Sequence, residues 1–570
     1  MSRARIALLA VALAAVLVRV WVVLDAGDAP FWTVPIVDEI AYMQMSERVV
    51  LGQDPPHGAY YMTPGYAWFL AALVAMGAQL PAVKSVQLAL GVLNAVLVFA
   101  LARRFFDTRV GVVAGLLWAV APTVLLHEIL ILKPTLTVFL ALLALWLVAR
   151  EGAGRLAWGV AGLLLGAAAT VRGEMLVVGL ALVVGALLAA RRGIRLAPAG
   201  GAAPLVGLVA ILAVVAVPTA QNHARGGGLV VIAYSGGPNF YIGNHERADG
   251  SYLPLRPGRS DAMVEEDDAV RLAREQSPLA LDAAGVSRFW WRQGLDWWAR
   301  EPADAFVLTV KKAVLLWGAW EGNDVHSLPI AGRWITALHN PLVRPWLIFP
   351  LALAGLVFLR PWRRGWPLVV FLLASWISLI PFFVFERFRI PMMAAATVLA
   401  AAVVVRAFDA WREGRRQTVI AGVLATGAAA GLLALPSVPR DESALHVNVG
   451  SMLLQQSRWE EALREFDAVR RDAPGAKRVE INRATALDRL GRHQEALRAL
   501  ATAMEALYAE ARGTGRPPVE ELTYCHELAG DIERRRGRLD EAARQYEAAL
   551  GLAPGHPRVR QKLGALRRGP

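Results

Sequence analysis

The sequence predicts an all-α protein, in which a polytopic membrane domain of about 11 transmembrane helices is followed by a C-terminal α-solenoid. The first observation is the composition: 56% of the 570 residues are hydrophobic and only 19% are charged, unlike soluble globular proteins. The second is a series of apolar runs that ends near residue 436. The third is a charged tail in which a short pattern recurs at regular spacing.

The apolar runs are long enough, or nearly long enough, to cross a hydrocarbon core of ~30 Å. Several are shorter than the ~20 residues of an ideal span, so the count holds to within one or two. The first run follows Arg3 and Arg5 and is not followed by a small-residue cleavage site, so we expect a retained anchor. The expected spans are 6–24, 85–101, 110–126, 134–149, 157–171, 174–190, 202–219, 343–359, 365–384, 391–405 and 418–436.

The basic residues indicate the orientation of these spans. With the N-terminus in the cytoplasm, the cytoplasmic segments carry 17 arginines and only four acidic residues, as the positive-inside rule requires. The net charge of +13 is therefore a topology signal and does not predict a nucleic-acid partner. We expect an integral inner or cell membrane protein with everything after residue 436 outside.

Three long segments fall on the expected external side, namely about 25–84, about 220–342 and the tail 437–570, and function is expected there. The first contains an apolar stretch from Thr63 to Leu80, bounded by Gly77 and Pro81. We expect this stretch to be a helix at the membrane surface, with a full span as the alternative.

The tail 437–570 contains an internal repeat. The segments 458–463 and 492–497 align at a spacing of 34 residues, and 538–543 is a third copy after an insert near Gly513. The pattern resembles the tetratricopeptide repeat, in which helical hairpins stack through small alanines. This resemblance implies a domain of about three repeats that binds a protein or peptide, with a folded spacer as the alternative.

Motifs with chemistry lie at the external ends of the spans, in a definite order. They are Asp38-Glu39 with Tyr42, Leu51-Gly52, the segment 60–66 (Tyr-Tyr-Met-Thr-Pro-Gly-Tyr), Glu128 with Ile131-Leu132-Lys133-Pro134, the segment 237–244, Ala248-Asp249-Gly250, and the segment 385–391. Their order and sidedness resemble the GT-C superfamily of glycosyltransferases, over residues 1–436. That superfamily uses polyprenyl-phosphate sugars and includes protein O-mannosyltransferases and the lipid A aminoarabinose transferase.

The resemblance implies an inverting glycosyltransferase that moves a hexose or pentose from a polyprenyl-phosphate donor to an acceptor hydroxyl. Such a reaction needs one base to take the acceptor proton and cations to stabilise the departing phosphate. In the family the first acid of the pair is matched to catalysis, so Asp38 is the expected base. Glu39 is its catalytic neighbour or orients a helix or a cation; helix N-terminal acids are the alternative for both residues.

The expected donor-phosphate ligands are Arg387, Arg389 and Lys133, because a charge at the membrane boundary must face the interface, a partner or a polar cavity. Pairing with Glu386 or snorkelling to the surface is the alternative for the two arginines. The expected substrate pocket is lined by Tyr42, Tyr61, Glu128, Asn239 and Asn244.

No metal site is predicted. His57 and the His127-Glu128 pair lack an H-E-x-x-H spacing, and the single cysteine, Cys525, excludes a Cys-rich site or an intrachain disulfide. The base-and-cation reaction requires no cofactor besides the polyprenyl-phosphate sugar, although some members of the superfamily bind a divalent metal.

A non-enzymatic membrane scaffold or a transporter, with repeats that recruit a partner, is the competing hypothesis. Transporters carry their polar residues near the middle of the membrane, whereas here the polar clusters lie at the external ends of the spans. That distribution favours the enzyme. The sugar and the acceptor, whether protein, glycolipid or polysaccharide, remain open at this point.

Overall fold

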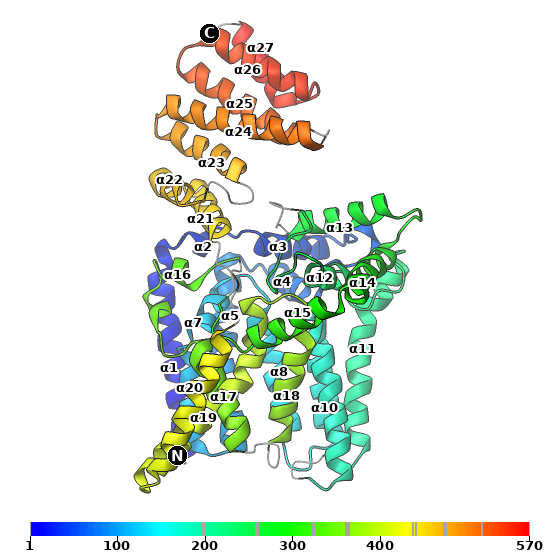
Figure 1. The fold of residues 1–570 in the computed structure, drawn as a ribbon, viewed down its shortest axis with the longest axis vertical. Coiled ribbons are helices and arrows are strands. Elements are labelled where there is room, and N and C mark those ends of the chain that lie inside the picture. Colours follow the sequence, from blue (N-terminus) through cyan, green and yellow to red (C-terminus); the bar gives the residue numbers. More distant parts are fainter. Residues whose placement is uncertain are drawn as a thin grey trace. The chain divides into compact units, whose positions relative to one another are not determined.

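The computed structural model describes residues 2–194, 198, 200–256, 262–321, 325–359, 365–435, 438, 442–470, 476–514 and 517–568. The chain forms two compact units, Met1–Arg440 and Asp441–Pro570, against the expected boundary at 436. All secondary-structure elements assigned in these residues are helices (Figure 1), which confirms the all-α prediction for the described part of the chain.

Each expected apolar run contains a helix in its described part, but only some of these helices reach the length of a span. Six helices are long and apolar enough to cross a membrane, or seven if the pair α6 and α7, bent by 53°, is one span. The six are α1 (Arg3–Asp25), α5 (Leu80–Phe105), α10 (Glu174–Arg191), α11 (Ala202–Ala224), α19 (Ile390–Arg412) and α20 (Arg416–Ala434); the bent pair is α6 (Thr108–Ala119) and α7 (Pro122–Ile129).

The other four expected spans form shorter helices of 14 to 17 residues. At ~1.5 Å per residue these helices measure only about 21–26 Å, so their crossing of the membrane stays a prediction. They are α8 (Pro134–Val148), α9 (Arg155–Val171), α17 (Pro345–Phe358) and α18 (Trp366–Leu379).

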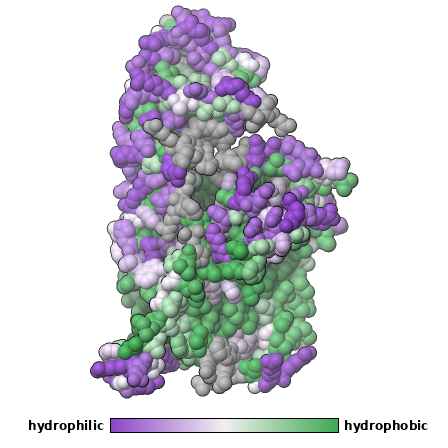
Figure 2. All heavy atoms as spheres, in the orientation of Figure 1, coloured by the Kyte–Doolittle hydropathy of each residue, from purple (hydrophilic) through white to green (hydrophobic). Residues whose placement is uncertain are grey.

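The long helices of the first unit present apolar side chains outward. On the face drawn in Figure 2, hydrophobic residues cover these helices and hydrophilic residues gather at both ends of this unit. Leu13 on α1 and Val209 on α11 are among the exposed residues, at 59% and 67%. Such a surface is suited to lipid rather than to water.

Small residues allow close helix packing inside the first unit. Gly162 on α9 lies directly against the backbone carbonyl of Gly207 on α11. A Cβ atom added at Gly207 would lie 3.0 Å from the carbonyl oxygen of Trp158 on α9. A side chain at either glycine would push the two backbones apart.

A break between α7 and α8 positions part of the candidate site. Pro122 and Pro134 stand at the first position of their helices, where the missing N–H is tolerated, and Leu130 between the helices is extended. The Gln87 amide on α5 donates hydrogen bonds to the carbonyl oxygens of Glu128 and Leu130, at 3.1 and 2.7 Å. The polar backbone of the break is thus partly satisfied by a neighbouring helix.

The two expected external segments of the first unit form short helices. The stretch expected as a surface helix forms α4 (Gly65–Ala75), which at 11 residues is too short for the alternative of a full span. The other helices are α2 (Pro30–Thr33), α3 (Asp38–Val50), α12 (Gly236–Ile242), α13 (Ala262–Gln276), α14 (Ala283–Arg300), α15 (Pro302–Leu315) and α16 (Leu328–Ala331), with short 3-10 turns at Ala26–Asp28, Pro56–Gly58 and Thr336–His339. Outside these two segments, a further 3-10 turn, Glu386–Arg389 (η5), lies between α18 and α19.

The second unit consists of consecutive helices, each packed on the next. They are α21 (Ser443–Gln455), α22 (Trp459–Asp467), α23 (Ala476–Arg489), α24 (His493–Thr514), α25 (Val519–Arg535), α26 (Leu539–Leu552) and α27 (Pro557–Arg568). The repeated alanines Ala462, Ala496 and Ala542 are all fully buried. The structure shows helical pairs here, and their identification as tetratricopeptide repeats stays a prediction.

Candidate functional site

The candidate site begins with an ion pair between two residues far apart in sequence. Asp38 opens α3, and its Oδ2 lies 2.7 Å from Nη1 of Arg387 in η5. Each side chain is 13% exposed, so the pair is largely but not completely shielded from solvent. The structure therefore brings the predicted base together with one predicted phosphate ligand.

The backbone before Asp38 is strained. Val37 has φ 46° and ψ −116°, in a region that a β-branched residue rarely adopts. Strain of this kind costs roughly 1–3 kcal/mol and persists only where the surrounding structure holds it, often at functional sites.

Glu39 has a different environment from its neighbour. It is completely buried, its Oε1 accepts a hydrogen bond of 2.7 Å from the Ile131 N–H in the α7–α8 break, and its Oε2 accepts one of 3.3 Å from the Ile36 N–H. The buried His326 ring lies 3.8 Å from Oε2. These contacts tie the start of α3 to the break, which favours the orienting role for Glu39 over direct chemistry.

Two further cations lie near the ion pair. Lys133, at the end of the break, donates a hydrogen bond of 2.7 Å to the Thr63 hydroxyl, and its Nζ lies 4.9 Å from the centre of the Tyr42 ring. Arg172, after α9, donates a hydrogen bond of 3.2 Å to the Arg387 carbonyl oxygen and pairs with Glu174. Thr63 and Arg172 are outside the predicted site set, although Arg172 stands at an expected external boundary.

Burial and the charges of Arg172 and Arg387 lower the pKa of Lys133 to about 7, against the opposing attraction of Asp38. The ammonium is thus poorly neutralised by the protein alone. A bound anion would relieve this deficit.

Sequence reasoning missed a buried carboxylate on α13, a helix that packs on α3. Glu265 on α13 accepts hydrogen bonds from two tyrosine hydroxyls, from Tyr61 at 2.8 Å and from Tyr252. Burial raises the pKa of Glu265, and the negative charge of Asp38 raises it further. Glu265 falls in an acidic run of an amphipathic helix, which reads as a solvated face, so only the fold reveals its position.

Three other predicted site residues make mainly structural contacts. Arg389 is buried and donates to the carbonyl oxygens of Gly318 and Trp320, at 2.8 Å each. Glu128 is held by both Nε and Nη2 of Arg19 on α1, at 2.9 and 2.6 Å. The Asn244 side chain contacts the Phe240 and Pro381 carbonyls, Trp298 and Lys312.

The remaining predicted pocket residues are Tyr42, Tyr61 and Asn239. Tyr42 is buried against Tyr66, with ring centres 5.2 Å apart, and so lies next to the Lys133 cation. Asn239 is half-buried on α12. Among the described residues, its side chain forms no hydrogen bond with another predicted site residue. Among the described residues there is no group of three or more His, Cys, Asp or Glu that could hold a metal ion.

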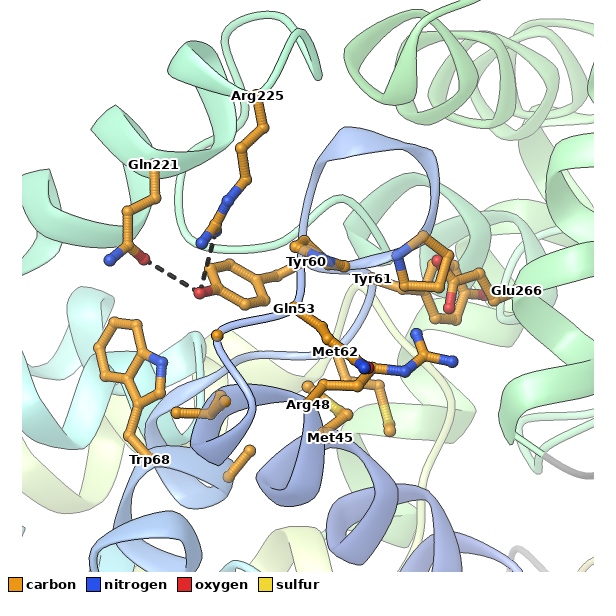
Figure 3. A pocket seen from close by; sticks show the side chains of 15 residues that line it. Met45, Arg48, Gln53, Tyr60, Tyr61, Met62, Trp68, Gln221, Arg225 and Glu266 are labelled. Atoms are coloured by element: carbon orange, nitrogen blue, oxygen red, sulfur yellow. Dashed lines mark hydrogen bonds between the residues drawn. The ribbon is translucent and has the colours of Figure 1, made fainter.

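A pocket with a volume of about 250 Å³ lies beside the candidate site and shares Tyr61 with it. Asp38 does not line this pocket. Its lining comes from the second half of α3, the segment 52–62, the start of α4, the end of α11 and α13. Figure 3 shows Tyr60 next to Gln221 and Arg225 on one side of the pocket, and Tyr61 with Glu266 on the other. Tyr61 is shared, because it lines the pocket and also donates to Glu265.

Residues 61–219 match the family described as dolichyl-phosphate-mannose-protein mannosyltransferase. The matched segment contains Lys133 and Arg172 but neither Asp38 nor Arg387. The match, which covers less than a third of the chain, supports the expected enzyme class, a glycosyltransferase dependent on a lipid-phosphate sugar. No curated protein sequence matches the chain.

Two solved structures are similar in part. One is the oligosaccharyltransferase of Archaeoglobus fulgidus in the apo form, with 16% identity, a TM-score of 0.43, and coverage of 84% of this chain and 59% of that chain. The other is Archaeoglobus fulgidus AglB with an inhibitory peptide and a dolichol-phosphate, with 17% identity, a TM-score of 0.39 and the same two coverages. The chain thus spans about three-fifths of their length, and TM-scores below 0.5 do not establish a common fold.

Proposed function

We propose that this chain is an inverting glycosyltransferase that acts at the external face of the inner or cell membrane. The proposal starts from the family match of residues 61–219 and from the Asp38–Arg387 pair. The chain transfers a sugar from a polyprenyl-phosphate donor to an acceptor hydroxyl. The observation that carries the proposal is a carboxylate bound to one arginine, with a poorly neutralised lysine and a second arginine close by.

In the proposed reaction the Asp38 carboxylate takes the proton of the acceptor hydroxyl. The acceptor oxygen forms a bond to the anomeric carbon as the bond from that carbon to the phosphate oxygen breaks. The leaving group is the lipid phosphate, a stable anion that needs no strong acid. Arg387, Lys133 and Arg172 supply the positive charge that stabilises it.

Binding of the donor changes the partner of Arg387 in this scheme. Without donor, Arg387 is paired with Asp38 at 2.7 Å. A donor phosphate that draws hydrogen bonds from Arg387 leaves Asp38 freer to act as base. Arg389 is a weaker candidate for the phosphate, since its guanidinium already donates to backbone carbonyls.

For the acceptor we propose a hydroxyl group of a protein, because the matched family's description prints a protein as the acceptor. The helical tail 442–568, as a set of tetratricopeptide repeats, would bind that protein or another peptide partner outside the membrane. The N-terminus would then lie in the cytoplasm, with the long loops and the tail on the outer side.

The test is transfer by the purified protein from labelled polyprenyl-phosphate sugars to peptides and to an envelope extract. We expect label transfer with inversion at the anomeric carbon, measured by NMR of the product, and transfer 10²–10⁴-fold slower in Asp38→Asn. Glu47→Gln, an exposed change on the same helix, is the matched control. If no sugar is transferred from any donor, the proposed activity is wrong and the hypothesis of a non-enzymatic scaffold is favoured.

A further inference from the structure

The pocket beside the candidate site has no role in the proposed chemistry. Its wall combines the thioethers of Met45 and Met62 and the rings of Tyr60 and Trp68 with several charged groups. Thioethers are adaptable apolar contacts, and the neighbouring polar groups give a ligand orientation. Such a mixture is suited to a flexible ligand with both apolar and charged groups.

Most of the charged groups in this pocket are already partnered. Arg225 lies 2.6 Å from Asp54 and donates to the Tyr60 hydroxyl at 3.1 Å. Glu266 accepts a hydrogen bond of 2.8 Å from Tyr234. The protein's own contacts thus account for one cation and one acid of the wall.

Arg48 differs from these groups. No hydrogen bond or ion pair joins its side chain to another residue in the described part of the chain. In Figure 3 the Arg48 side chain extends from α3 toward the side of the pocket where Tyr61 and Glu266 lie. A half-buried guanidinium in this position is available to a ligand carboxylate.

The geometry of α3 relates this cation to the proposed base. Asp38 opens the helix and Arg48 follows ten residues later, which corresponds to about 15 Å along the helix axis. An extended peptide advances ~3.3 Å per residue, so about four or five residues cover that separation.

We propose that this pocket binds the acceptor polypeptide at a side chain four or five residues from the reacting hydroxyl, with Arg48 selecting an acidic residue there. The inference rests on the proposed function and on a protein acceptor. The shared residue Tyr61 lines the pocket and donates to Glu265 on α13, the helix that packs on α3, so the pocket and the start of α3 adjoin one another.

The test uses the full-length protein, the active donor, and synthetic peptides with one threonine. Each peptide carries a single glutamate or a single lysine at one position, from six residues before the threonine to six after it. We expect glutamate four or five residues away to raise kcat/KM about ten-fold over lysine at the same position. Arg48→Glu should reverse this preference, and Arg48→Lys should retain it in weaker form.

The control is Glu47→Lys, a change of charge of the same size and opposite sign at the adjacent exposed position, which should leave the preference unchanged. The inference is overturned if the wild type does not prefer glutamate over lysine at any position of the peptide. It is also overturned if Arg48→Glu keeps the wild-type preference. Label on glycolipid or polysaccharide but on no peptide also overturns it while the glycosyltransferase stands. If no acceptor of any kind is labelled, the proposed function and this inference both fail.

Discussion

At the scale of single residues, the adjacent acids Asp38 and Glu39 occupy different environments. The Asp38 side chain is 13% exposed and bound by a side chain, whereas Glu39 is completely buried and bound by two backbone N–H groups. A carboxylate with satisfied, buried backbone partners holds the fold, and one that shares a cation is able to exchange that partner. The residue directly before them, Val37, has a positive φ of 46°.

The lowered pKa of Lys133 predicts a pH dependence of donor binding. Burial and neighbouring cations place this pKa at about 7, so the ammonium form prevails below that pH and the neutral amine above it. The donor phosphodiester stays anionic throughout, so its KM should rise as pH increases from about 6 to about 8.

The matched variant is Lys133→Arg, which keeps the charge at all these pH values. Its KM for the donor should vary much less with pH than that of the wild type. Identical pH profiles for the two proteins would show that Lys133 does not meet the phosphate.

Some of the site could be predicted from the sequence. Asp38 and Arg387 stand in recognisable motifs at the external ends of spans, and the fold places them 2.7 Å apart. Glu265 could not be predicted, because its two tyrosine partners become neighbours only through packing of α13. Arg389 illustrates the opposite error, since its motif suggests a ligand and its environment consists of backbone carbonyls.

At the scale of elements, the helix pairs of the second unit depend on contacts between a glycine and an aromatic ring. A Cβ at Gly450 would lie 2.5 Å from Cε1 of Phe466, and one at Gly530 would lie 2.6 Å from Cε1 of Tyr546. The equivalence of these contacts in two separate pairs agrees with the repeat read from the sequence.

Gly530→Ala should therefore destabilise the second unit by roughly 1–3 kcal/mol through overpacking. Gly551→Ala is the matched control, because it also lies in a helix but meets nothing within 4 Å. Pulse proteolysis of the full-length protein, read at fragments of residues 442–568, measures the difference. Equal resistance of the two variants would contradict the close packing of α25 on α26.

The apolar runs predicted the positions of helices better than their lengths. Proline fixes where several helices start, for example α7, α8 and α17, and a run divided by proline yields shorter pieces. The 53° bend between α6 and α7 lies within one expected span, ahead of Pro122. Hydropathy alone averages over such breaks, so it could not distinguish six or seven full-length spans from eleven.

At the scale of the whole molecule, the arginine distribution predicts the orientation. Cysteines introduced by Gln417→Cys and Ala468→Cys, each in a Cys525→Ser background, occupy exposed positions on the expected inner and outer sides. A membrane-impermeant maleimide should label position 468 in intact spheroplasts and position 417 only after lysis. The reverse pattern would place the repeat unit in the cytoplasm and overturn the assignment of an outer active face.

The central claim is that Asp38 performs the proton transfer and Arg387 binds the donor phosphate. Single-turnover transfer from preloaded donor, together with the donor Kd, separates these two roles. Asp38→Asn should bind donor at least as tightly as wild type, because Arg387 loses a competing partner, and should transfer 10²–10⁴-fold more slowly, whereas Arg387→Gln should weaken donor binding. Wild-type single-turnover rates in Asp38→Asn, or an unchanged donor Kd in Arg387→Gln, would contradict the claim.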